Sequence, residues 1–187
     1  MKSPVLPLAA AALASWAMIT PAASGQEETF TATASVKTKN VRATAPVSIT
    51  ISRFATDAER ASVNAALKSG GNRAAKELLA KMPDSGKLEM GENHVPIKYA
   101  VARSTGSGRV IVLATAEPLL HPGSGLPEAK PKSKDDVAVA ILVLDANNTG
   151  HGELAAAAQV KTTPSGAITI DHYDAPKIWL KDIAKAR

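Results

Sequence analysis

The feature that most constrains the fold of this chain is an alternation of apolar and polar side chains that recurs along most of its length. It is clearest over residues 29–36, where Phe30, Ala32, Ala34 and Val36 alternate with threonine and serine. Successive side chains of a β-strand point to opposite faces of the sheet. This period of two therefore predicts a half-buried strand.

Similar segments, separated by turn residues, predict further strands. We expect them at residues 46–52, 87–90, 95–102, 109–116, 137–144, 153–161, 167–173 and 178–183. Strands joined by short turns pair as antiparallel neighbours. Residues 109–116 and 137–144 are apolar on both faces, which predicts positions at the centre of the sheet, where both faces are covered.

The period changes to a helical one between residues 56 and 83. Thr56 followed by Glu59 matches a capping box and predicts a helix over residues 57–69. We expect this helix to present a face of small side chains, namely Ala58, Ala61, Ala65 and Ala66. Gly70 and Gly71 would end it. A second helix would follow from Asn72, and its apolar stripe, which we interpret as core packing, consists of Ala75, Leu78, Leu79 and Met82.

Together these elements predict an α+β fold. We expect a mainly antiparallel sheet of about seven to nine strands, covered on one face by a two-helix hairpin. The length of 187 residues suits a single domain, placed at residues 26–187. Only 3% of the residues are aromatic and there is no cysteine, so the core must be built mostly from aliphatic side chains without disulfides.

One stretch fits none of these patterns. Residues 117–136 contain four prolines and a lysine-rich end, and they separate two expected strands. A long connection without its own periodicity is either functional or a mobile excursion. We expect a mobile Pro/Lys-rich surface loop, with a working lid as the alternative. Leu119, Leu120 and Leu126 could pack against the domain.

The amino terminus has the order of a secretory signal. A positive start at Lys2 is followed by an apolar run over residues 5–19, then Pro21 and the small residues 22–25. This order predicts a cleavable signal peptide over residues 1–25, with cleavage within residues 22–25. The run is shorter than the ~20 residues that a membrane anchor needs. We therefore expect an exported protein, periplasmic or extracellular, with no membrane span after cleavage.

Several short blocks of the chain are familiar in combination. They are TDAER at 56–60, ALKSGG at 66–71, KMP at 81–83, YA at 99–100, RVIVLAT at 109–115 and GHGEL at 150–154. With these blocks the chain resembles, over residues 46–184, a group of exported bacterial proteins of unknown function. In that group Thr115 is usually followed by an acidic and a basic residue, whereas this chain has Ala116 and Glu117. The resemblance implies a signal peptide and one α+β domain, but no activity and no site residues.

The histidines do not form a metal motif. His94, His121, His151 and His172 are scattered singly, without His-x-His or i, i+4 spacing. His172 lies in the phase of an expected strand and is flanked by Asp171 and Asp174, whose charges would raise its pKa if they were in contact. We interpret His172 as a residue at the end of a strand.

Residues 145–150 (DANNTG) match the beginning of a calcium-binding loop. Oxygen-bearing side chains stand at the first, third and fifth positions, and glycine stands at the sixth. The twelfth position should be a chelating glutamate, but it is Ala156, and Glu153 at the ninth does not replace it. The segments on either side are expected strands, so we interpret the motif as a hairpin turn.

Motifs for nucleophilic or phosphate chemistry are incomplete. Residues 123–125 (GSG) lack the spacing of a nucleophile elbow, and residues 106–108 (GSG) lack the following helix of a phosphate loop. The acidic pairs at residues 27–28 and 135–136 are expected to be solvated. We assign no catalytic, cofactor-binding or metal-ligating residue and expect no cofactor.

These observations leave two functional hypotheses. The net charge of +5 is spread along the chain and aromatics are few, which argues against nucleic-acid binding. The first hypothesis is a non-enzymatic exported module that binds a protein, a small ligand or an envelope component through a sheet edge or residues 117–136. The alternative is a small secreted hydrolase whose catalytic residues meet only in the fold. A deep pocket lined by close titratable groups would favour the hydrolase, and an exposed apolar patch would favour the binding module.

Overall fold

The computed structural model of the chain describes residues 27–162, 168–173 and 175–186. The predicted signal peptide, residues 1–25, lies outside the described residues. No helix of the described part is long and apolar enough to cross a membrane.

The described residues form nine strands and one helix, and each segment predicted to be a strand contains one. In chain order the elements are β1 (Glu28–Lys37), β2 (Arg42–Ile51), α1 (Asp57–Lys81), β3 (Gly86–Met90), β4 (Asn93–Thr105), β5 (Gly108–Thr115), β6 (Val137–Asp145), β7 (Thr149–Thr162), β8 (Ile168–Asp171) and β9 (Ile178–Lys185).

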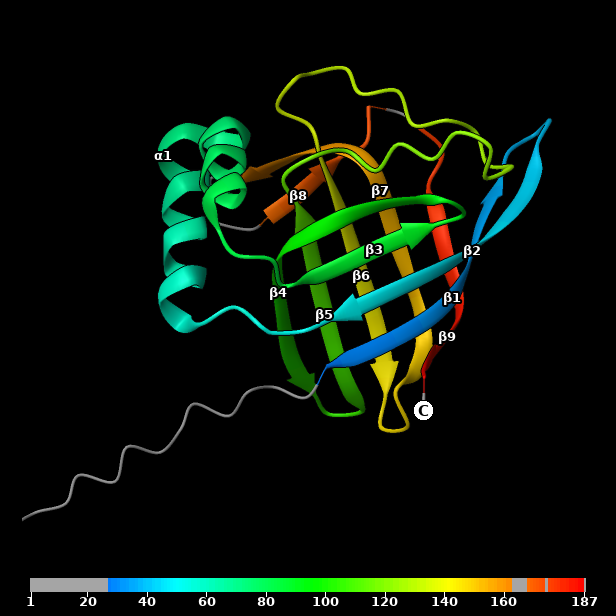
Figure 1. The fold of residues 1–187 in the computed structure, drawn as a ribbon, viewed down its shortest axis with the longest axis horizontal. Coiled ribbons are helices and arrows are strands. Elements are labelled where there is room, and N and C mark those ends of the chain that lie inside the picture. The colour runs from blue at the N-terminus through cyan, green and yellow to red at the C-terminus, as the bar shows by residue number, and fades with distance from the viewer. Residues whose placement is uncertain (1–26, 163–167, 174, 187) are drawn as a thin grey trace, which may run out of the picture.

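Eight of the strands close into an antiparallel barrel (Figure 1). Their order is β6-β5-β4-β3-β2-β1-β9-β7, and pairing between β6 and β7 closes the ring. The closing ladder runs from Val137, opposite Ala158, to Leu144, opposite Gly150. β8 lies outside the ring and pairs with the last residues of β7.

The predicted open sheet covered by a two-helix hairpin is therefore wrong. Strand periodicity reports which side chains are buried, but a closed and an open sheet bury them with the same alternation. A closed barrel differs from an open sheet by the pairings of β9 with β1 and with β7. Neither pairing is between strands that are consecutive in the chain. Because the ring is closed, β5 and β6 are not central strands of an open sheet, and the eight strands have no free edge.

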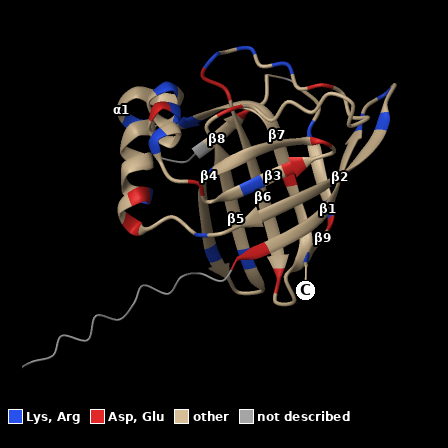
Figure 2. Cartoon of the chain, in the orientation of Figure 1, with Lys and Arg blue, Asp and Glu red and all other residues tan. Residues whose placement is uncertain are grey.

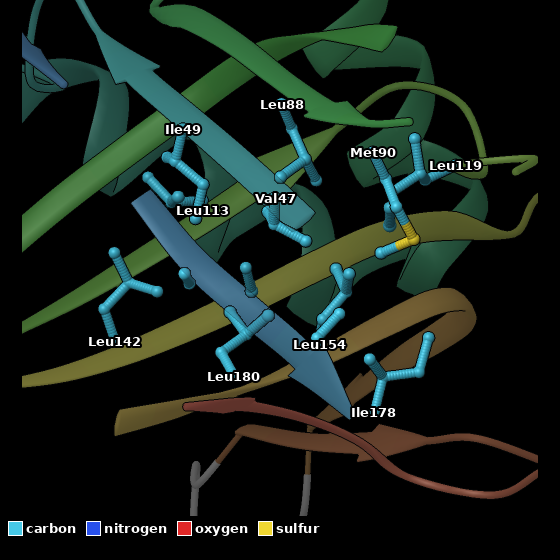
Figure 3. Close-up of a cluster of buried hydrophobic side chains, with 14 of the residues drawn as sticks. Val47, Ile49, Leu88, Met90, Leu113, Leu119, Leu142, Leu154, Ile178 and Leu180 are labelled. Atoms are coloured by element: carbon cyan, nitrogen blue, oxygen red, sulfur yellow. The ribbon is translucent and has the colours of Figure 1, made fainter. Parts of the chain in front are cut away.

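The barrel interior is filled by side chains rather than hollow. Figure 3 shows aliphatic residues from all sides of the ring pointing toward one another. The largest fully buried side chains are Phe30, Ile49, Ile51, Leu88, Met90, Ile97, Ile111, Leu113, Leu119, Leu142, Leu154 and Leu180. Phe30 is the single aromatic among them, as the aliphatic composition predicted.

The helical region is a single element, α1, which consists of two helical stretches that meet at the predicted glycine break. Its backbone departs from helical geometry at Gly71 (φ 64°, ψ −151°), where the chain kinks. A positive φ of this kind suits glycine, which has no Cβ to clash. The predicted apolar stripe is partly confirmed: Ala75, Leu79 and Met82 are buried against the barrel.

The predicted small-residue face of the first half of α1 is wrong. Ala58, Ala61 and Ala65 are exposed, whereas Val63 and Leu67 are buried against the outer wall of the barrel. A period-based assignment chose the alanines because they recur at helical spacing. Two larger side chains bury more apolar area than several alanines, and they determine which face turns inward.

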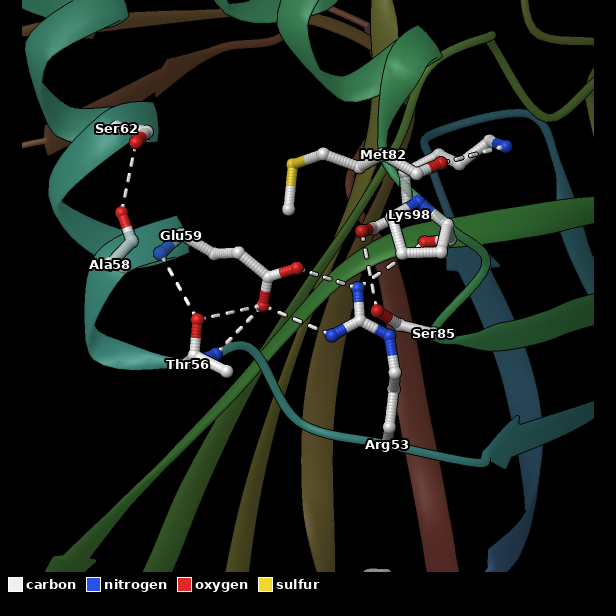
Figure 4. Close-up of polar contacts among 9 residues, drawn as sticks. Arg53, Thr56, Ala58, Glu59, Ser62, Met82, Ser85 and Lys98 are labelled. Atoms are coloured by element: carbon white, nitrogen blue, oxygen red, sulfur yellow. Dashed lines mark hydrogen bonds and ion pairs between the residues drawn. The ribbon is translucent and has the colours of Figure 1, made fainter. Parts of the chain in front are cut away.

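The start of α1 is fixed by the predicted capping box, which is confirmed (Figure 4). The backbone N–H of Glu59 donates to Thr56 Oγ1 (3.2 Å), and the backbone N–H of Thr56 donates to Glu59 Oε2 (2.8 Å). Both terminal nitrogens of Arg53 donate hydrogen bonds to the Glu59 carboxylate, at 3.0 and 2.8 Å. Mainly through the Arg53 hydrogen bonds, the pKa of Glu59 is lowered to about 2.

A second ionic network lies at the barrel end that holds the β4–β5 and β6–β7 turns. Arg109 donates to both carboxylate oxygens of Glu28 (2.9 and 3.1 Å), and Lys185 donates to Glu28 as well (2.8 Å). Burial raises the pKa of Glu28, but these hydrogen bonds outweigh it, so the net pKa is lowered. The predicted solvation of Glu28 is wrong, because its side chain is only 13% exposed.

Candidate functional site

The opposite end of the barrel is crossed by the connection between β5 and β6, residues 116–136 (Figure 1). Leu119 and Leu126 are buried in the barrel core, whereas Leu120 is 53% exposed. The backbone N–H of Leu119 donates to the carbonyl of Ala156 on β7 (2.8 Å). The segment is thus attached to the barrel by its leucines. That it is mobile in solution stays a prediction.

The lysine-rich end of this segment is held by a buried carboxylate. Asp136 is fully buried, which corrects its predicted solvation, and its Oδ2 accepts the backbone N–H groups of Lys132 (2.8 Å) and Ser133 (3.0 Å). Its Oδ1 accepts the hydroxyl of Tyr173 (2.5 Å), from the connection between β8 and β9. Burial, and then the Asp136 carboxylate, raise the pKa of Tyr173 above its ordinary value. Tyr173 therefore stays a protonated donor to Asp136.

Between this connection and the barrel lies a pocket of ≈ 240 Å³, here named the mouth pocket. It forms where β7 changes partners, since β7 pairs with β9 up to Leu154 and with β8 from Gln159 onward. Among the described residues, the stretch 155–158 between these ladders pairs with neither strand. Ala155, Ala156 and Ala157 of this stretch line the pocket, together with Val36 and Ile178 from the barrel core.

His121 is a polar side chain in the lining of this pocket and is almost fully buried. It is 1% exposed, and its Nδ1 lies 3.1 Å from Ser124 Oγ. Ser124 Oγ also accepts the backbone N–H of Leu126 (3.3 Å), which fixes the local turn. The other ring nitrogen, Nε2, is buried and has no hydrogen-bond partner among the described residues. Such a group is costly to leave unsatisfied, so it marks a place where a ligand atom would be stabilised.

The environment keeps His121 neutral. Burial lowers the pKa of its imidazole, although the backbone at His121 and the charge of Glu128 oppose that effect. A neutral imidazole can donate or accept one hydrogen bond at Nε2, according to its tautomer. The lowered pKa makes it a weak base at neutral pH.

His172 and Lys132, two further polar side chains of the pocket lining, already have partners. His172 Nε2 lies 3.1 Å from Glu153 Oε1, and Lys177 lies 3.2 Å from the other oxygen of Glu153. Lys132 donates to the carbonyl of Tyr173 (3.1 Å) and stands 5.3 Å from the centre of its ring. His172 therefore lies beside the pocket but pairs with Glu153 instead of Asp171, which binds Lys161.

The calcium-like motif folds as the predicted hairpin turn. Asp145 Oδ1 accepts the backbone N–H groups of Asn147 (2.8 Å) and Thr149 (3.0 Å), and its Oδ2 accepts the Thr149 hydroxyl (2.8 Å). These hydrogen bonds lower the pKa of Asp145. Asn148 adopts a positive φ of 60°, which suits this residue type in a tight turn. The carboxylate is thus used by the turn itself.

Sequence reasoning missed His121 as a site residue. A single histidine in a proline-rich connection carries no spacing signal, and its burial depends on β7 and β9, which are distant in sequence. The available signal was its place between Leu119 and Leu126, because two leucines in a polar segment indicate that the segment turns toward a core. In the described residues no cluster of three or more His, Asp or Glu side chains is arranged to hold a metal ion.

The described residues thus form a closed β-barrel with a packed interior and a pocket at one end. Comparison of the chain with protein-family models, with curated proteins and with solved structures finds no match.

Proposed function

We propose that the protein is an exported binding module that takes a small ligand in the mouth pocket. The observation that carries the proposal is the buried, unpartnered Nε2 of His121 in a pocket walled by apolar side chains. A protein that only needed to fold would gain stability from an apolar residue at this place. Within the described residues the ring has no free edge, and the strand with one is the short β8 (Ile168–Asp171), which favours the 117–136 connection over a sheet edge.

The shape and chemistry of the pocket restrict the ligand. A volume of ≈ 240 Å³ lies below the usual ~300–1,000 Å³ of pockets for drug-sized molecules, so the ligand is small. The alanine wall suits a short apolar body. Its polar group would bond to His121 Nε2, while Lys130 and Lys132 at the lining favour a neutral or anionic molecule over a cation.

Export is supported by the sequence alone. The predicted signal peptide over residues 1–25 and the lack of cysteine agree with a protein that is stable in an oxidising compartment without disulfides. The resemblance to exported bacterial proteins points the same way. Expression with and without residues 2–25, followed by fractionation, tests it: the full chain should lose its amino-terminal segment and leave the cytoplasm.

A fragment screen by NMR tests the binding function. Small carboxylic acids, amides and alcohols would be added to protein labelled in the histidine rings and alanine amides. We expect at least one fragment to shift the His121 ring together with the amides of Ala155 and Ala157. His121→Leu should abolish these shifts, and the matched control His151→Leu, at an exposed site, should keep them. If no fragment perturbs the His121 ring, the proposal is wrong.

The hydrolase is a second candidate, favoured by the contact of Ser124 Oγ with His121 Nδ1. The pocket does contain several titratable groups, but its two histidines contact different residues: His121 contacts Ser124, and His172 contacts Glu153. No described carboxylate is bonded to His121 Nε2, which would orient it as a base. Labelling by a fluorophosphonate that is lost in Ser124→Ala and kept in Ser62→Ala would establish the hydrolase. Absence of labelling, with fragment binding intact, leaves the binding module.

A further inference from the structure

A second hollow, here named the helix cleft, lies outside the barrel between α1 and the strands. It measures ≈ 240 Å³ and its lining is almost wholly apolar. α1 contributes Val63, Leu67 and Leu79, and the barrel wall contributes Val112, Ala114 and Ile141. Figure 1 shows α1 standing beside the barrel, and the helix cleft shares no lining residue with the mouth pocket. The cleft is therefore independent of the function proposed above.

Polar contacts attach α1 beside this cleft at its start and at its kink. Asn72 accepts the backbone N–H of Val160 (2.9 Å) and donates to the carbonyl of Asp135, next to the kink at Gly71. The Arg53–Glu59 pair fixes the start of the helix. The lining of the cleft includes the small side chains of Ala75 and Ala114, which fill little of the space.

An open hollow of ≈ 650 Å³ that carries positive charge lies next to the helix cleft. The two share Val112, and the second hollow is lined by Arg60 and Arg103 as well as Val101 and Val110. Arg103 makes no ion pair with any described residue. Arg60 pairs with Asp57 at side-chain exposures of 47% and 93%, and such a surface pair is weak. Figure 2 shows basic residues near the lower ends of β4 and β5.

We propose that the helix cleft binds a medium-chain fatty acid, with the alkyl chain under α1 and the carboxylate at Arg60 and Arg103. The planar guanidinium matches a carboxylate through two parallel hydrogen bonds. An apolar slot beside exposed cationic groups is complementary to a molecule with one tail and one negative head. The volume of the slot suits a single short chain and excludes a phospholipid with two chains.

Chain length supplies the first test. Hexanoate, octanoate and decanoate would be titrated below their micelle concentrations into protein with labelled valine and isoleucine methyl groups. Each added methylene that enters the cleft should raise the affinity roughly fourfold. The methyl signals of Val112 and Ile141 should shift. Affinity that is independent of chain length, or shifts confined to the mouth pocket, would overturn the proposal.

Two substitutions separate the tail site from the head site. Ala114→Phe fills the cleft and should weaken decanoate at least tenfold, whereas Val143→Phe, on the exposed outer face of β6, should not. Arg103→Gln should weaken decanoate by up to about fivefold and leave decanol unchanged. Lys181→Gln, an exposed cation on β9, is the matched control and should affect neither.

Several results would count against the assignment. Ala114→Phe that folds and still binds decanoate as well as the parent chain excludes the helix cleft. If Ala114→Phe does not fold, Ala114→Leu replaces it, with circular dichroism as the check on folding. Binding to vesicles of phosphatidylglycerol without any methyl shift by decanoate would identify a membrane surface as the ligand and overturn the proposal. None of these outcomes involves His121, so the two proposals fail separately.

Discussion

Replacing His121 by leucine tests separately what the buried imidazole costs in folding stability and what it contributes to the proposed ligand binding. The side chain is 1% exposed, and its Nε2 lacks a partner among the described residues. A buried unsatisfied polar group costs about 1–3 kcal/mol, while the lost hydrogen bond to Ser124 is worth about 0.5–1.5 kcal/mol. His121→Leu should therefore leave the free energy of unfolding unchanged or raise it by up to about 2 kcal/mol, although fragment binding is lost.

The same variant has a pH signature. Burial lowers the pKa of folded His121 below the ordinary value of 6.5, so the unfolded chain takes up a proton at a pH where the folded chain does not. The parent protein should lose stability as the pH falls below 6.5, until the pKa of the folded state is passed. The slope cannot exceed ~1.4 kcal/mol per pH unit. His121→Leu should lack this part of the pH dependence.

Urea unfolding of both proteins between pH 4 and 8 measures both effects, with His151→Leu as the control for an exposed histidine. A loss of more than ~2 kcal/mol in His121→Leu at pH 8 would refute the reasoning, because it would mean that the imidazole is satisfied and holds the turn. An unchanged pH slope would refute the assignment of a neutral, buried histidine.

Three further substitutions test the supports of the fold. Leu79→Ala should cost about 2–5 kcal/mol in urea unfolding, because Leu79 is 4% exposed between α1 and the barrel; an effect near zero would show that α1 is not seated there. Ionised Glu59 contributes stability above pH 4.5, and this contribution is lost as the pH falls toward 2, the pKa of Glu59 in the folded state. Glu59→Gln should therefore reduce the fall in melting temperature between pH 4.5 and 2. An unchanged fall would contradict the pairing with Arg53. Tyr173→Phe removes the hydroxyl that donates to the fully buried Asp136 and should lower the free energy of unfolding by about 1–3 kcal/mol. Hydrogen exchange in residues 130–136 should increase. Unchanged exchange would show that this contact does not hold the β5–β6 connection.

The sequence predicted the strands well because their signals are local. The alternation over residues 29–36 needs only neighbouring side chains, and the capping box at Thr56 needs only four residues. The hairpin turn at Asp145 follows likewise from short-range hydrogen bonds. All three are confirmed because no distant element competes with them.

Closure of the barrel could not be predicted in the same way. It depends on β9 lying between β1 and β7, so that Thr33 faces Lys181 and Glu153 faces Trp179. The first pair joins the two ends of the chain, the second spans β8 and its connections, and no turn motif specifies either. The site inherits this difficulty, because the burial of His121 and Asp136 follows from closure and from the position of the β8–β9 connection.

The alanine run at residues 155–158 is a second sequence signal that could have located the mouth pocket. Alanine is depleted in strands because it packs little surface, so four in succession within β7 weaken a strand that must serve several neighbours. Small side chains are tolerated there because β7 is released by β9 after Leu154 and joined by β8 only at Gln159. Ala155, Ala156 and Ala157 line the same pocket as His121, so larger side chains at these three positions would reduce its volume. The packed barrel thus has its pocket where β7 changes strand partner, and the size of the proposed ligand is limited by the space that these small side chains leave free.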